Sequence, residues 1–211
     1  MSILPADLLA NRAAPFRGSR YPELLCLHKP QNAQHLVQFY EDESFIIENV
    51  SFLAAHALVS GDSSVIVATE PHLRAIRERI AAHGLNLNLL QKSGLYVPVD
   101  ASEALARFMV DRSPDRVKFN QFIGGILSSA ENQGGRGFVF AFGEMVDLLC
   151  AAKNPQAAVH LEQLWNDLAT RHHFSLYCAY SLSSLGDVPD ADALMRICAE
   201  HSLTIPSETP L

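Results

Sequence analysis

The chain has 211 residues, 48% of them hydrophobic, and a net charge of −7 at pH 7. This length can supply one substantial core, so we expect a single domain. The 16 Lys and Arg residues are scattered, which argues against direct nucleic-acid binding. No apolar run reaches the roughly 18 residues of a membrane span, and the N-terminus lacks a secretory pattern. We therefore expect a cytoplasmic protein without a membrane segment.

Apolar strands alternate with helical patterns along the chain. Residues 1–32, with prolines and little periodicity, are expected to form an arm before a domain at 33–206 and a tail at 207–211. Strands are predicted at 35–40, 63–70, 95–100, a segment ending near Phe142, and 174–180. Helices are predicted at 43–59, 71–84, 101–110, 115–131, 145–152, 156–173 and 190–202.

This alternation indicates an α/β fold, because strands buried on both faces form parallel sheets covered by helices. We predict a three-layer αβα sandwich whose mainly parallel sheet has about five strands. Pro98 lies in the third strand and lacks a backbone N–H, which indicates either an edge position in the sheet or an irregular end of that strand.

Motifs of common enzymes and nucleotide-binding proteins are missing from the sequence. The chain has no GxxxxGK[ST], no dinucleotide-binding glycine fingerprint, no HExxH and no GxSxG. The glycine cluster at 134–137 precedes a strand instead of opening a helix, so we interpret it as a turn. We therefore assign no catalytic residue and no cofactor.

The cysteines and histidines show no metal-ligand spacing. Cys26, Cys150, Cys178 and Cys198 are far apart and are interpreted as buried thiols. Most of the nine histidines have ordinary explanations at helix ends or on the surface. We expect no metal site.

Polar and aromatic residues at the carboxyl ends of the predicted strands are the candidates for ligand binding, because ligands of open α/β sheets bind at that edge. These residues are Gln38, Phe39, Tyr40, Glu41, Asp42, Thr69, His72, Asp100, Phe142, Glu144 and Tyr180. Asp42 and Asp100 are equally well explained as helix N-caps. The sequence leaves open whether these two acids bind a ligand or only cap a helix.

Five motifs occur together in an order that identifies a family resemblance. They are "HLVQFYED", "FGEMVDLL", "LEQLWNDL", "FSLYCAY" and "ICAEHSLTIP". In this order and spacing they resemble the MEDS domain, the methanogen/methylotroph, DcmR sensory domain, over about residues 34–206. The first motif adds His35 to the candidate ligand-binding residues.

The resemblance implies a bacterial or archaeal signalling domain that senses small molecules such as hydrocarbon derivatives. It also implies a RecA/KaiC-like fold that has lost its phosphate loop, and output through a histidine kinase or a transcription regulator. Family members usually carry an Arg where this chain has Phe140. An anionic ligand is therefore less expected, unless a group such as Arg136 holds it.

Three functions follow, in order of preference. The first is a non-catalytic sensory domain that binds a small molecule or a signalling partner at the carboxyl edge and can form a homodimer. The second is a degenerate nucleotide-binding protein without ATPase activity, which the acidic turn at 41–43 disfavours. The third is an enzyme with Glu144 as a general base near His72 or His35.

Overall fold

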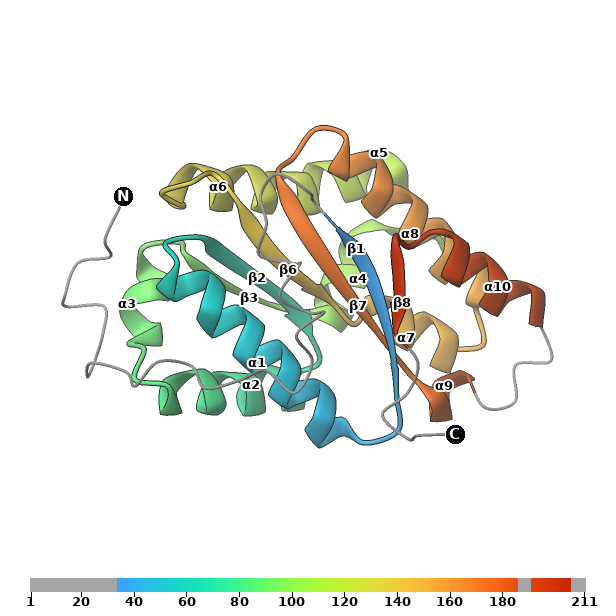
Figure 1. Cartoon of the computed structure of the whole chain (residues 1–211). Helices are drawn as coiled ribbons and strands as arrows, with labels where there is room; N and C mark the ends of the chain where they lie inside the picture. Colours follow the sequence, from blue (N-terminus) through green and yellow to red (C-terminus); the bar gives the residue numbers. More distant parts are fainter. Residues whose placement is uncertain (1–33, 186–190, 206–211) are drawn as a thin grey trace.

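The computed structural model describes residues 34–185 and 191–205 (Figure 1). The arm predicted at 1–32 and the tail predicted at 207–211 lie outside the described residues, as does Cys26. Among the helices that the structure describes, none combines the length and the apolar character needed to cross a membrane.

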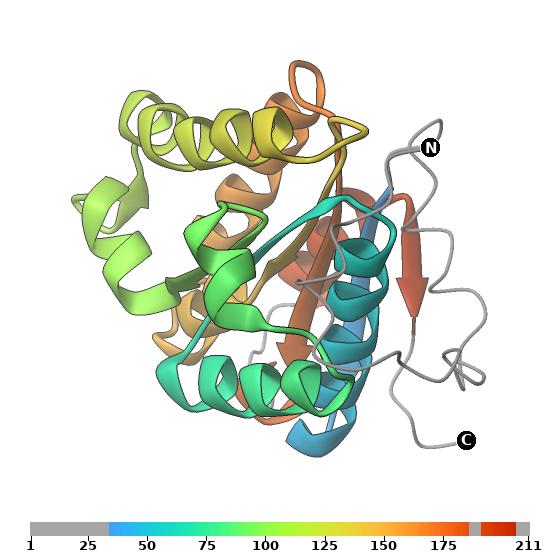
Figure 2. The same ribbon diagram turned by 90° about the vertical axis from the view of Figure 1, so that its left-hand side faces the viewer.

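One sheet lies at the centre of the described part of the chain. Its six strands run in the order β3-β2-β6-β7-β1-β8, and all neighbouring strands are parallel. The strands are β1 (His35–Tyr40), β2 (Ser63–Ala68), β3 (Tyr96–Asp100), β6 (Val139–Gly143), β7 (Phe174–Ser181) and β8 (Leu203–Ile205). Figure 2 shows β8 as the red arrow at one edge of the sheet. The sequence predicted five of these strands and missed β8.

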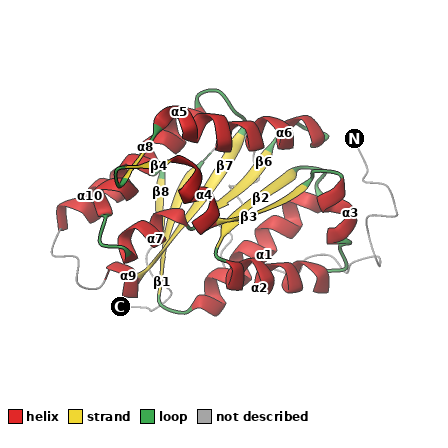
Figure 3. Ribbon diagram, turned by 180° about the vertical axis from the view of Figure 1, so that it is seen from behind, coloured by secondary structure: helices red, strands yellow, loops and turns green. Residues whose placement is uncertain are grey.

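Helices cover both faces of the sheet. One layer contains α1 (Glu43–Val59), α2 (Glu70–Ala82) and α3 (Leu87–Lys92). Figure 3 shows the other layer from its own side. That layer contains α4 (Ala101–Phe108), α5 (Arg116–Phe119), η3 (Asn120–Gly124), α6 (Gly125–Gln133), α7 (Met145–Ala151), α8 (Pro155–Ala169) and α10 (Ala191–Ala199), while α9 (Leu182–Leu185) follows β7. The predicted three-layer sandwich is confirmed.

The alternation of side chains along each strand explains why both faces are covered. In β1, Leu36 and Tyr40 pack in the core beneath α1, whereas Val37 and Phe39 pack in the core beneath α8. Since successive strand residues point to opposite faces, a continuous apolar run supplies both cores at once.

Two predicted helices differ from the structure. The helix expected at 101–110 ends at Phe108 and continues into a small hairpin of β4 (Met109–Val110) and β5 (Ser113–Pro114). The helix expected at 115–131 is interrupted by the π-helical segment η3. A Cβ at Gly124 in this segment would come within 3.4 Å of the Leu168 side chain, so the glycine permits close packing against α8.

Several local predictions are confirmed. Pro98 lies in β3, which is an edge strand. The Asp42 carboxylate accepts a hydrogen bond from the backbone N–H of Ser44 at 2.8 Å and caps α1. The Asp100 carboxylate caps α4 through the backbone N–H of Glu103, also at 2.8 Å.

Candidate functional site

Glu144 brings two turns together at the carboxyl edge of the sheet. It follows β6, and its side chain is nearly buried. One carboxylate oxygen lies 2.6 Å from Nδ1 of His72, and the other accepts a 2.7 Å hydrogen bond from the backbone N–H of Thr69. Glu144 therefore joins the turn after β6 to the start of α2.

The carboxyl edge is acidic, and burial changes how its groups titrate. The hydrogen bond to Glu144 raises the pKa of His72, although burial opposes this. Burial raises the pKa of Asp147 from 3.8 to about 6, while the Ser181 N–H lowers it. Burial and the nearby Asp147 carboxylate also raise the pKa of Tyr40. The carboxylates of Glu144 and Glu43 therefore favour a cationic His72.

The other predicted residues do not all line this edge. Glu41 and Asp42 are exposed in the turn before α1, and Asp100 ends the edge strand β3. Gln38, Phe39, Phe142 and Tyr180 are buried. The Tyr180 side chain packs beneath α8 and hydrogen-bonds there to Glu162.

Two residues lie at the opposite, amino-terminal edge, contrary to expectation. His35 is the first residue of β1, so the strand itself separates it from the carboxyl edge. Arg136 precedes β6, and its guanidinium pairs with the carboxylate of Asp62. Arg136 therefore does not replace the missing arginine at position 140.

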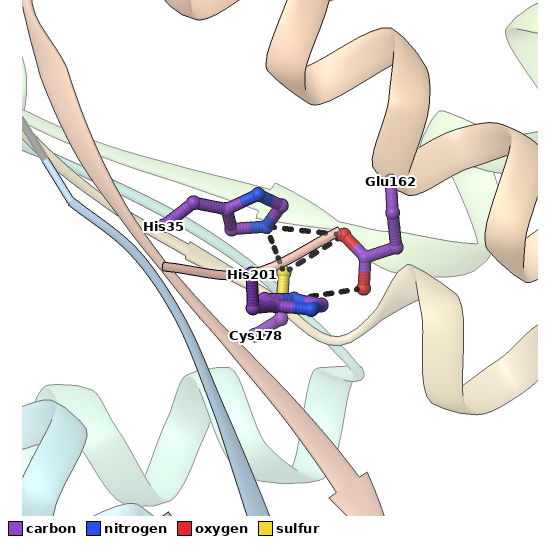
Figure 4. Close-up of side chains that lie close together, drawn as sticks. All are labelled: His35, Glu162, Cys178 and His201. Carbon is purple, nitrogen blue, oxygen red and sulfur yellow. Dashed lines mark hydrogen bonds and ion pairs between the residues drawn. The ribbon is translucent and has the colours of Figure 1, made fainter. Parts of the chain in front are cut away.

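At this amino-terminal end, His35 belongs to a buried group of four side chains that we call the His/Glu/Cys cluster: His35, Glu162, Cys178 and His201 (Figure 4). Nε2 of His35 lies 3.2 Å from Oε2 of Glu162, and Nε2 of His201 lies 3.4 Å from Oε1. The Cys178 sulfur lies 3.4 Å from Oε2 of Glu162 and 3.5 Å from Nε2 of His35. The Glu162 side chain is completely buried.

Hydrogen bonds outside the cluster determine which nitrogen of each imidazole carries hydrogen. The Asn166 amide nitrogen donates to the backbone oxygen of Glu200 at 3.0 Å, so its Oδ1 must be the atom 2.7 Å from Nδ1 of His35. Nδ1 of His201 lies 2.7 Å from the backbone oxygen of Ile197. Both Nδ1 atoms therefore donate, and Nε2 of each ring faces Glu162.

The Glu162 carboxylate is strongly biased towards its ionised form. Burial alone would raise its pKa, but His201 and His35 lower it well below the ordinary value. The Tyr180 hydroxyl also donates to Oε1 at 2.7 Å. Burial, together with Glu162, raises the pKa of the Cys178 thiol, which stays protonated unless a cation is present.

A pocket of about 360 Å³ opens beside the cluster, between the amino ends of β1 and β7 and the ends of α8 and α10. Its apolar wall contains Trp165, Phe174 and Leu176. Two members of the cluster, His35 and His201, also line the pocket, whereas Glu162 and Cys178 do not. Its other lining residues are Gln34, Asn166, Ala169, Glu200 and Ser202. Neither Lys nor Arg occurs among these described lining residues.

One feature of the sequence indicated the cluster and was missed. Glu162 lies on the buried stripe of α8 beside Leu161 and Trp165, and a carboxylate there requires a partner. His201 was interpreted as a helix-end residue and Cys178 as a core thiol. Those interpretations treat each residue separately and do not include the contacts of His201 and Cys178 with Glu162.

Comparison with known proteins supports the resemblance seen in the motifs. The family model described as MEDS, the methanogen/methylotroph, DcmR sensory domain, matches residues 34–202. This match covers most of the chain. No curated protein sequence matches it.

Proposed function

The chain belongs to the MEDS family of sensory domains, and we propose that it detects a small uncharged organic molecule in the pocket beside Trp165. A hydrocarbon derivative with one polar group fits the chemistry of this pocket. The volume of about 360 Å³ is at the lower end of the range for ligand pockets. The single observation that carries the proposal is the combination of this apolar wall with convergent polar side chains.

The polar lining favours a neutral ligand over an anion. Gln34 and Ser202 add polar groups to the lining, while Glu200 would repel a carboxylate or phosphate. The exposed acids at 41–43 likewise disfavour a nucleotide at the first turn. We propose no catalysis, since sensing requires only binding.

The pocket position suggests how binding would be transmitted. Its wall joins α8 to the connection between α10 and β8, which contains His201 and Ser202. A ligand that contacts both parts would favour one arrangement of this C-terminal connection. We propose that a cytoplasmic histidine kinase or transcription regulator detects the change.

Trp165 provides the test, because it is the only tryptophan in the chain and it lines the pocket. Titration with a series of primary alcohols should change its fluorescence in a saturable way. Ala169→Phe, which places a ring in the pocket lining at the end of α8, should abolish saturation. Ala82→Phe is the matched control, since Ala82 is an exposed residue at the end of α2.

Equal responses of the two variants, or a wild-type response that never saturates, would contradict binding in this pocket. Calorimetry with ATP and Mg²⁺ distinguishes this sensory function from the alternative, nucleotide binding. Micromolar binding of ATP would favour a degenerate nucleotide-binding protein instead.

A further inference from the structure

We propose that the His/Glu/Cys cluster is a zinc site, with Nε2 of His35 and His201, one Glu162 carboxylate oxygen and the Cys178 thiolate as its four ligands. Figure 4 shows that the four side chains point towards one another from β1, α8, β7 and the segment after α10. This site is independent of any organic molecule in the neighbouring pocket.

The spacing of the ligand atoms suits a tetrahedral ion. Zinc lies about 2.0–2.1 Å from nitrogen or oxygen and about 2.3 Å from sulfur, which places neighbouring ligand atoms about 3.3–3.6 Å apart. The separations are 3.2 Å between Nε2 of His35 and Oε2 of Glu162, 3.4 Å between the Cys178 sulfur and Oε2, and 3.5 Å between that sulfur and Nε2 of His35. Nε2 of His201 lies 3.4 Å from the other carboxylate oxygen, Oε1. All the ligand atoms lie within 4.8 Å of one another.

The surrounding hydrogen bonds orient three of the ligands as a metal requires. Histidines that bind a metal usually donate their other N–H to a fixed acceptor, and here Asn166 and the Ile197 carbonyl are those acceptors. The Tyr180 hydroxyl occupies Oε1 of Glu162, which leaves Oε2 for the ion. Among the residues that the structure describes, Nε2 of His201 makes no hydrogen bond although it is buried.

Charge explains why a cation belongs in this position. The cluster buries the Glu162 carboxylate, and a buried carboxylate requires a positive charge beside it. A Zn²⁺ ion would balance Glu162 and the thiolate of Cys178, whose proton passes to solvent on binding. The thiol and imidazole ligands favour zinc over Mg²⁺ or Ca²⁺, which prefer oxygen.

The pocket supplies an access route, because His35 and His201 form part of its wall. Glu162 and Cys178 lie behind them, and four protein ligands complete the coordination. A closed tetrahedral site of this kind is typical of structural zinc. The ion would therefore fasten the segment after α10 onto β1 and β7.

Metal binding by the full chain, stripped with chelator and then dialysed against Zn²⁺ alone, tests the proposal. We expect about one zinc per chain by mass spectrometry of the metal, and a higher melting temperature with Zn²⁺ than with Mg²⁺. Replacing Zn²⁺ with Co²⁺ should give a thiolate-to-cobalt absorption band. Wild-type protein that retains no zinc, or a cobalt spectrum without the thiolate band, would overturn the site.

Matched variants identify the ligands. Cys178→Ser should remove the thiolate band, whereas Cys150→Ser, at another buried cysteine, should keep it. Asn166→Ala removes no ligand and should weaken zinc binding about 10–100-fold. His172→Gln is its control, because His172 also pairs with a glutamate, Glu131, at 3.0 Å, but outside the cluster.

Loss of the band in both cysteine variants, or equal affinities for Asn166→Ala and His172→Gln, would contradict the assignment. If Cys178→Ser does not fold, the wild-type cobalt spectrum and Asn166→Ala still decide the question. If the cluster is a buried histidinium–glutamate network without metal, the protein should keep its melting temperature in chelator and bind no zinc. That result would also overturn the proposal.

Discussion

Replacing Asp147 by Asn should make the protein more stable near neutral pH. Burial raises the pKa of this carboxyl group from 3.8 to about 6. A difference of about two pH units corresponds to about 3 kcal/mol at most. Because the folded protein holds this proton more tightly than the unfolded chain, the wild-type free energy of unfolding should fall as pH rises from about 4 to about 6. Above that range the Asp147 contribution should stay constant.

Asn at position 147 keeps the oxygen that accepts the 2.9 Å hydrogen bond from the Ser181 N–H, but it does not titrate. Urea unfolding of both proteins between about pH 4 and about pH 7 should show the variant gaining about 2–3 kcal/mol relative to wild type. Asp167→Asn is the control, since this exposed carboxylate should give a pH-dependent difference below about 1 kcal/mol. A difference between Asp147→Asn and wild type that does not change with pH would refute the reasoning.

Two further predictions concern stability. Glu144→Ala should lower the free energy of unfolding, measured by urea unfolding, by about 2–4 kcal/mol, because the Thr69 N–H and His72 lose a buried acceptor. A loss below about 1 kcal/mol would argue against Glu144 as the residue that joins the two turns. Gly137→Ala should lower the melting temperature, because its φ is +63°. Gly125→Ala is the control, because Gly125 lies in a helix with open space at its Cβ, and it should leave the melting temperature unchanged or raise it. A melting temperature that is lower for Gly125→Ala than for Gly137→Ala would contradict this explanation.

Local chemistry made much of the fold predictable. The apolar run of β7 and the alternation of strands with helices indicate a covered parallel sheet, and Pro98 indicates its edge. The β4–β5 hairpin was not predictable from periodicity, since it depends on positive φ at Asp111 and Arg112, and an arginine rarely adopts that conformation. β8 was missed because only three residues form it, and two of them are exposed.

The candidate site was harder to predict because its residues form a site only through contacts between distant parts of the chain. His35 and His201 are separated by nearly the whole domain, yet their rings lie 4.0 Å apart. Each has an ordinary explanation as a strand-start or helix-end residue. Glu144, by contrast, was identified from its place directly after a strand, because the carboxyl ends of parallel strands meet at one edge.

The pairing of β8 with β1 has a consequence for synthesis of the chain. Leu36 pairs with Leu203, and the Ser202 N–H donates to the His35 oxygen at 2.7 Å. At about 5–20 residues per second, a ribosome needs roughly 10–30 s to pass from the first of these strands to the last. Throughout that interval the backbone N–H and C=O groups on the outer edge of β1 lack their partner strand and can pair with another nascent chain. Synthesis of β8 is thus also the event that protects β1.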